Sequence, residues 1–198
     1  MNICVYGSSS TELPESIMKG AFRMGELIAK AGHGMVYGGG AQGVMGASAM
    51  GARSAGGAVL GVAPRFFNVD GVLFEDCTEF IYTDTMRERK QIMEDRSDAF
   101  IVCPGGVGTF EEFFEILTLK QLSQHTKPIV ILDIDGYCPM GIVVYHTDTI
   151  TAIVGSDVFI IHRQDCTNLG ENTACGVLQR ITYAVVGFGF FGGRRQRG

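Results

Sequence analysis

Short apolar runs alternate with longer segments of helical periodicity from the N-terminus to about Gly136. Runs rich in β-branched residues predict strands, at residues 2–6, 34–37, 58–62, 79–82, 99–102 and 128–132. Between them, apolar residues recur at three- and four-residue spacing and predict helices, at residues 14–31, 43–55, 85–96 and 109–123. This alternation of strand and helix is typical of a parallel α/β sheet.

Several of the predicted strands are apolar at every position, as at residues 100–103 and 129–132. Strands lack polar alternation when helices cover both faces of their sheet. The sequence therefore predicts a Rossmann-like, doubly wound parallel α/β sheet. In such sheets, ligands bind at the carboxyl ends of the strands.

The pattern changes beyond Tyr137, where helical periodicity fades and no lysine follows Lys127. Strand propensity favours strands at residues 143–144 and 158–161, without a clear architecture for the rest. We expect a Rossmann-like domain at residues 1–137 and an atypical C-terminal tail at residues 138–198. Such a loosely packed tail should be cleaved by proteases before the domain is.

Composition excludes several classes of protein. Hydrophobic residues make up 46% and charged residues 19% of the 198 residues, which is enough to bury a core and excludes a disordered chain. The net charge of −5 with scattered basic residues disfavours nucleic acid as a partner. The chain has no long apolar run and no leader-like start, so no membrane association and a cytoplasmic location are expected. Six cysteines without a C-x-x-C pair predict reduced thiols and no metal site.

The strongest motif is a glycine-rich loop that follows a buried strand and opens a helix. It reads Pro104, Gly105, Gly106, Val107, Gly108, Thr109, Phe110, Glu111 and Glu112. Backbone N–H groups at a helix start favour an anion, and a threonine hydroxyl can add a donor. The alternative is a tight turn without a ligand. The loop matches neither the dinucleotide G-x-G-x-x-G pattern nor a P-loop, which disfavours an ATPase.

Two further glycine clusters follow predicted strands, one at Gly7 and Ser8 and one at Gly38, Gly39 and Gly40. Either alone is more typical of a turn. Because parallel strands end at the same sheet edge, three such loops together favour a nucleotide site.

Charged residues near two predicted helix starts add candidate chemistry. Met86, Arg89 and Lys90 lie at the start of one helix, just after a strand end. A solvated helix face is the alternative for these cations. Glu112 lies one turn into the helix after the loop, where a glutamate can stabilise the helix dipole or reach a bound ribose.

Together these residues resemble the LONELY GUY family, the cytokinin riboside 5'-monophosphate phosphoribohydrolases formerly labelled lysine decarboxylases. The family pattern P-G-G-x-G-T-x-x-E matches residues 104–112, and its R-K pair matches Arg89 and Lys90. Further matches are the Gly38–Gly40 cluster with Gly43, Met45 and Gly46, and Gly61, Pro64 and Arg65. The resemblance covers residues 2–137. Family members usually continue with aspartate-proline where this chain has Cys138 and Pro139.

The resemblance implies hydrolysis of the N-glycosidic bond of a purine nucleoside 5'-monophosphate. It implies no cofactor or metal, a nucleotide substrate and a homodimer. It assigns catalysis to Arg89 and Glu112. The candidate substrate-binding residues come from the glycine loops and from the start of the helix at 85–96, and are Gly7, Ser8, Gly39, Gly40, Met86, Lys90, Pro104, Gly105, Gly106, Val107, Gly108 and Thr109.

The chemistry agrees with that assignment. A carboxylate such as Glu112 can stabilise the positive charge that develops on ribose, whereas Arg89 is too basic to act as a general acid.

The main alternative is a non-catalytic nucleotide carrier or sensor on the same fold. A pyridoxal-phosphate decarboxylase needs a Schiff-base lysine, and it is disfavoured because Lys90 is the only lysine near the predicted cleft and nothing around it suggests that cofactor. The sequence does not distinguish adenine from an N6-modified adenine.

Overall fold

The computed structural model describes residues 1–132 and 134, and the backbone of residues 143–146, 149–154 and 157–162. Its first sheet contains β1 (Asn2–Tyr6), β2 (Gly34–Tyr37), β3 (Val59–Pro64), β4 (Glu79–Thr83), β5 (Ala99–Val102) and β6 (Ile129–Ile131). The helices between these strands are α1 (Glu15–Lys30), α2 (Gly43–Ser54), α3 (Met86–Asp95) and α4 (Val107–Gln121), with a 3-10 turn, η1 (Arg65–Phe67), after β3. The predicted strands and helices of this part of the chain are confirmed to within two residues.

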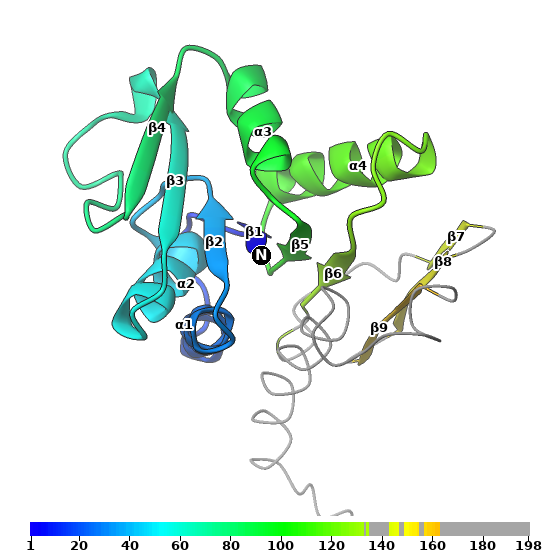
Figure 1. Ribbon diagram of the computed structural model, residues 1–198. Helices are drawn as coiled ribbons and strands as arrows, with labels where there is room; N and C mark the ends of the chain where they lie inside the picture. Colours follow the sequence, from blue (N-terminus) through cyan, green and yellow to red (C-terminus); the bar gives the residue numbers. More distant parts are fainter. Residues whose placement is uncertain (133, 135–142, 147–148, 155–156, 163–198) are drawn as a thin grey trace, which may run out of the picture.

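The strands lie in the order β4-β3-β2-β1-β5-β6, and every neighbouring pair is parallel (Figure 1). The chain therefore runs outward from β1 in one direction and, after α3, crosses back to continue from β5 in the other. Loops on either side of such a reversal lie side by side and leave a crevice for ligands. Here the reversal brings the loop after β1 next to the loop after β5.

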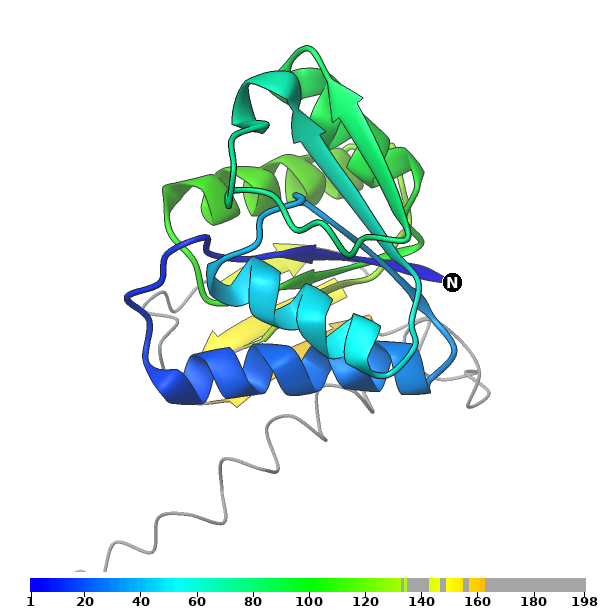
Figure 2. The ribbon, with the colours of Figure 1, turned by 90° about the vertical axis from the view of Figure 1, so that its left-hand side faces the viewer.

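Helices cover both faces of the sheet, which confirms the doubly wound fold. Alternate residues of β1 belong to two separate cores: Ile3 packs in the core that contains buried residues of α1 and α2, and Cys4 in the core that contains Met93 of α3 and Phe113 of α4. Figure 2 shows α1 and α2 side by side on one face of the sheet. Two covered faces explain why strands such as β5 and β6 are apolar at every position.

The two helices on one face approach closely because glycines line their contact. A Cβ on Gly25 of α1 would lie 2.0 Å from the backbone oxygen of Ser48, and one on Gly51 of α2 would lie 2.0 Å from that of Phe22. Backbone therefore packs on backbone at both places. The chain has 28 glycines, and these two serve helix packing rather than a binding loop.

A second, separate sheet follows in the described part of the C-terminal region. β7 (Val143–His146), β8 (Thr149–Val154) and β9 (Asp157–His162) pair antiparallel in the order β7-β8-β9. The strands predicted at 143–144 and 158–161 are confirmed, and β8 was not predicted. The domain boundary expected at Tyr137 lies outside the described residues. None of the helices in the described part is long and apolar enough to cross a membrane.

Candidate active site

The loop after β1 contacts both of the other glycine loops. The backbone N–H of Ser8 donates to the oxygen of Pro104 (3.1 Å), and the N–H of Met45 in α2 donates to the oxygen of Ser8 (3.2 Å). A Cβ on Gly7 would lie 2.5 Å from Cγ1 of Val44. The structure thus brings the three predicted loops together at one edge of the sheet.

The loop after β2 has a backbone that only glycine adopts easily. Gly39 and Gly43 have φ angles of +77° and +63°, and a Cβ on Gly43 would lie 2.4 Å from the oxygen of Ser8. Gly40 forms an isolated antiparallel bridge with Leu73. Together with the hydrogen bonds from the Ala41 N–H to the oxygen of Val72 and from the Phe74 N–H to the oxygen of Gly39, this bridge places residues 72–74 against the loop, a contact that local sequence patterns did not indicate.

The start of α4 has free backbone donors. Gly106 is the N-cap residue and no side chain caps the helix. A Cβ on Gly106 or on Gly108 would meet no atom within 4 Å, so the space beside the first turn is open. Gly105 instead lies against buried Thr109, because its Cβ would be 2.1 Å from the threonine Oγ1. The first turn of α4 can therefore accept an anion of the size of phosphate.

Arg89 and Glu112 form a buried ion pair between α3 and α4. Nη1 of Arg89 lies 2.7 Å from Oε1 of Glu112, and the two residues are 6% and 9% exposed. Arg89 also donates from Nε to the backbone oxygen of Val62 in β3 (3.1 Å). A Cβ on Gly38 would lie 2.0 Å from Nη2 of Arg89. The guanidinium is therefore held between the ends of β2 and β3 and the carboxylate of α4.

Local sequence determines where α3 begins and hence where Arg89 lies. Thr85 and Glu88 form a capping box: the Glu88 N–H donates to Oγ1 of Thr85, and the Thr85 N–H donates to Oε2 of Glu88, both at 3.2 Å. The helix therefore starts at Met86. Arg89, one turn later, is buried against the sheet, while Met86 is exposed.

The environment of Glu112 suits chemistry with a developing positive charge. Burial raises the pKa of the Glu112 carboxyl, and the Arg89 guanidinium opposes that rise. A carboxylate out of bulk water interacts more strongly with a cation than an exposed one does. Such a group can stabilise an oxocarbenium-like state or orient a water molecule.

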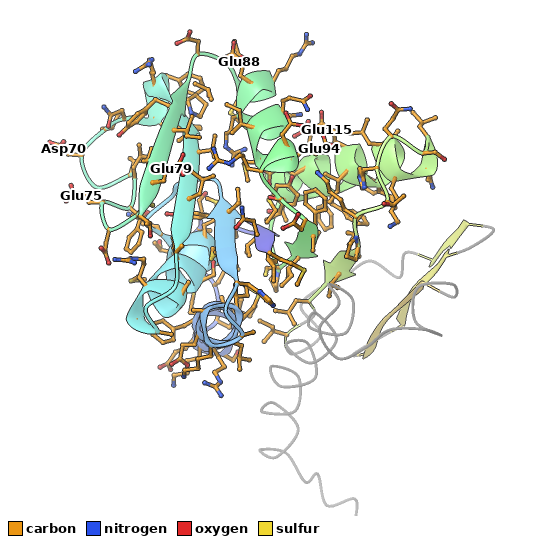
Figure 3. The ribbon with its side chains drawn as sticks, viewed as in Figure 1. Asp70, Glu75, Glu79, Glu88, Glu94 and Glu115 are labelled. Atoms are coloured by element: carbon orange, nitrogen blue, oxygen red, sulfur yellow. The ribbon has the colours of Figure 1, made fainter. Side chains whose placement is uncertain are left out.

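Lys90, the next residue on α3, contacts α4 as well. Its Nζ lies 2.6 Å from Oε2 of Glu115 and also contacts Oε1 of Glu111. Figure 3 labels Glu88 at the start of α3 and Glu115 near the meeting of α3 and α4. Two consecutive cations of α3 therefore pair with carboxylates of one turn of α4.

The described cysteines are free thiols. Cys4 and Cys103 are buried and Cys77 is partly buried; the other three cysteines lie outside the described residues. Burial raises the pKa of Cys4 and of Cys103 to about 12, so both remain protonated at neutral pH. Within the described part of the chain, no group of three or more His, Cys, Asp and Glu side chains could hold a metal ion.

Comparison with known proteins places this site in a family. The family model described as "Possible lysine decarboxylase" matches residues 45–147. The chain is 47% identical over 135 residues to the cytokinin riboside 5'-monophosphate phosphoribohydrolase of Mycobacterium tuberculosis, which covers 68% of this chain and 72% of that protein. The Arabidopsis thaliana phosphoribohydrolase LOG2 is 37% identical over 68% of this chain, which spans only 63% of the plant protein.

Solved structures share the fold. The molybdenum cofactor carrier protein of Chlamydomonas reinhardtii is 28% identical with a TM-score of 0.56, over 66% of this chain and 75% of that one. The molybdenum cofactor binding protein of Rippkaea orientalis is 27% identical with a TM-score of 0.53, over 68% of this chain and 76% of that one. The fold is thus shared with a cofactor carrier protein and a cofactor-binding protein, whereas the relatives cited above are phosphoribohydrolases by name. By its family match and its identity to the mycobacterial enzyme, the chain belongs to the LONELY GUY family, the family that its motifs resemble.

Proposed function

We propose that this protein hydrolyses the N-glycosidic bond of a purine nucleoside 5'-monophosphate to the free base and ribose 5-phosphate. The observation that carries the proposal is the buried pair of Arg89 and Glu112, 2.7 Å apart beside the uncapped start of α4. The mycobacterial relative is a phosphoribohydrolase by name, which supports the same reaction. A cation, a carboxylate and an anion site are the parts that a nucleotide hydrolase needs.

The 5'-phosphate binds at the first turn of α4 in this proposal. The N–H groups after Gly106 have no side-chain cap, and the helix dipole favours negative charge there. The open space at Gly106 and Gly108 lets the phosphate approach the backbone. The remaining candidate binding residues, from the loops and the starts of α3 and α4, surround the nucleotide and are Gly7, Ser8, Gly39, Gly40, Met86, Pro104, Gly105, Val107 and Thr109.

Glu112 acts on the ribose and on water. As the bond between C1' and the base nitrogen breaks, its electron pair leaves with the base and positive charge develops on the ribose ring. The Glu112 carboxylate stabilises that charge and accepts a proton from the water whose oxygen bonds to C1'. The departing base takes up a proton from solvent.

Arg89 binds the nucleotide and does not transfer a proton. An arginine guanidinium stays charged in proteins, so it does not supply a proton to the departing base. Held by Val62 and Glu112, it is oriented to donate hydrogen bonds to the nucleotide or to the departing base.

Base release tests the proposal directly. Purified protein is incubated with AMP and, separately, with N6-isopentenyl AMP, and the products are separated by chromatography. We expect free base from at least one nucleotide. Nucleotide binding by calorimetry without any base release would instead support a carrier or sensor.

We also propose that the protein forms a homodimer through the outer side of α4. Exposed apolar residues lie along α4 and at its C-cap: Val107 is 87% exposed, Phe114 43% and Leu122 63%. Exposed apolar patches commonly mark interaction surfaces. Light scattering after size exclusion should give twice the 21.3 kDa mass of the chain, and Phe114→Glu should give the monomer. A monomeric wild-type protein would refute the homodimer.

A further inference from the structure

Lys90 is almost enclosed by its contacts with α4. Its side chain is 15% exposed, against 55% for Glu111 and 43% for Glu115. An ammonium group has three hydrogen-bond donors, and these two carboxylates occupy two of them. The described geometry therefore directs Lys90 toward α4 more than toward the glycine loops.

The contact of Lys90 lies beside that of Arg89. Glu111 and Glu115 are four residues apart and share one side of α4. Glu112 is the buried carboxylate next to them and pairs with Arg89. Consecutive cations on α3 thus hold three carboxylates of one turn of α4, and the orientation of Glu112 depends on how that turn lies against α3.

The charges around Glu112 are nearly balanced. Burial raises the pKa of Glu112 and Arg89 opposes the rise most strongly; Glu111 raises the pKa further, and Lys90 lowers it. Loss of Lys90 would leave Glu111 and Glu115 without a counter-charge beside the buried carboxylate. Like charges close together disfavour ionisation.

The strand beneath Glu112 contributes no formal charge. Cys4 and Tyr6 of β1 are its titratable neighbours there. Burial raises the pKa of Cys4 to about 12 and raises that of Tyr6 as well, so both are neutral at pH 7. Besides burial, the charges that act on Glu112 are therefore those of Arg89, Lys90 and Glu111, and Lys90 also offsets the charge of Glu115 through their contact.

We propose that Lys90 is a positioning residue, which ties α4 to α3 and offsets the charge of Glu111 and Glu115, so that the Glu112 carboxylate stays ionised on Arg89. The inference rests on the function proposed above. It gives Lys90 a role through Glu112, in place of the substrate contact expected from the sequence.

Kinetics of Lys90→Met separate these two roles. We expect kcat to fall about tenfold, KM to stay within about threefold, and the acid limb of the kcat–pH profile to move to higher pH. Lys90→Arg should keep most of kcat. Lys19→Met is the matched control, because it removes the exposed pair of Lys19 with Glu15 and should change nothing.

Removal of the partner charges should reverse the effect. In the triple variant Lys90→Met, Glu111→Gln and Glu115→Gln, no uncompensated charge remains, and we expect most of kcat and the original acid limb to return. If Lys90→Met does not fold, the double variant Glu111→Gln and Glu115→Gln is measured instead. It removes negative charge beside Glu112 and keeps Lys90, so the acid limb should move to lower pH. A rise in KM above tenfold at constant kcat, or no recovery in the triple variant, would overturn the inference.

A titration makes the test independent of turnover. In protein with 13C-labelled glutamate carboxyls, the Glu112 signal is identified by its loss in Glu112→Gln. Its titration midpoint should move to higher pH in Lys90→Met, and an unchanged midpoint would refute the role of Lys90. A wild-type protein that releases no base would refute the proposed hydrolysis, while the titration would still decide the role of Lys90.

Discussion

At the scale of single residues, the pair of Arg89 and Glu112 is the centre of the proposed chemistry. Both side chains are buried, and each is the charged partner of the other. Removal of one partner of a buried pair leaves an uncompensated charge, which typically costs about 3–5 kcal/mol. A substitution that tests catalysis must therefore keep the size of the side chain and its hydrogen bond.

Glu112→Gln meets that condition. Glutamine keeps an oxygen that can accept from Arg89, but it lacks the negative charge that the transition state needs. We expect kcat to fall about 10²- to 10⁴-fold and nucleotide affinity to stay within several fold. Base release gives kcat, and calorimetry gives the affinity.

Glu79→Gln provides the control, since Glu79 forms an exposed pair with Arg96 and should tolerate the change. If Glu112→Gln kept the wild-type rate and lost only some stability, Glu112 would be an ordinary helix-start glutamate.

The raised pKa of Glu112 predicts a pH dependence. Burial raises this pKa above its ordinary value of about 4.3, and activity requires the ionised form. The rate should fall as pH drops through the raised pKa, earlier than for an exposed glutamate. The stability of the fold depends on pH in the opposite direction from the rate. Because the folded protein binds the Glu112 proton more tightly than the unfolded chain, this stabilisation is complete below the unfolded-state pKa and is lost as pH rises through the folded-state pKa.

The measurements are the pH profile of kcat and the free energy of unfolding of wild type and Glu112→Gln at several pH values. Wild type should gain stability relative to the variant on acidification. The same difference in stability at every pH would contradict a raised pKa.

At the scale of elements, the N-terminus of α4 combines a weak cap with a binding surface. Gly106 adopts an extended conformation, with φ of −102° and ψ of −154°, that any residue can take, and a Cβ there meets nothing. Asparagine and aspartate are better caps than glycine. Glycine at this position therefore makes α4 less stable than asparagine or aspartate would, and it leaves the backbone N–H groups free for a ligand.

Gly106→Asp should separate stability from binding. A capping aspartate also interacts well with the helix dipole, so we expect stability to rise by about 0.5–1 kcal/mol. Its charge and its hydrogen bond would exclude a phosphate, so KM for AMP should rise more than about tenfold. Thermal unfolding and steady-state kinetics measure the two effects.

Gly106→Asn is the uncharged comparison, which caps the helix and should weaken binding less. Unchanged KM in both variants would place the phosphate away from α4.

At the scale of the whole molecule, the described structure has two sheets of different kind. The parallel sheet with its helices contains the three glycine loops and the pair of Arg89 and Glu112, whereas β7, β8 and β9 form an antiparallel sheet of their own. The division of the chain at Tyr137 remains a prediction.

Limited proteolysis with mass spectrometry tests that division. The sequence after Tyr137 lacks the apolar periodicity of a packed α/β unit, and weakly packed segments open to proteases most readily. We therefore expect the first cuts between Thr147 and Arg180. First cuts within residues 2–137 would show that the C-terminal region is at least as well protected as the parallel sheet.

Sequence alone determined the elements and the loops of the parallel sheet. Apolar periodicity is a local property, so strands such as β2 and helices such as α2 were predicted from adjacent residues. Glycines at strand ends marked the loops for the same reason. α4 starts two residues before the predicted position, at Val107, because the backbone enters the helix directly from the glycine turn.

Only the tertiary structure decided which of these residues meet. Arg89 and Glu112 are 23 residues apart, and their contact exists because the strand order places α3 and α4 on one face of the sheet. The contacts of Lys90 with Glu111 and Glu115, and the bridge of Gly40 with Leu73, arise in the same way. Such contacts depend on how distant elements pack, and a local pattern of apolar and polar residues carries no information about the partner across the fold.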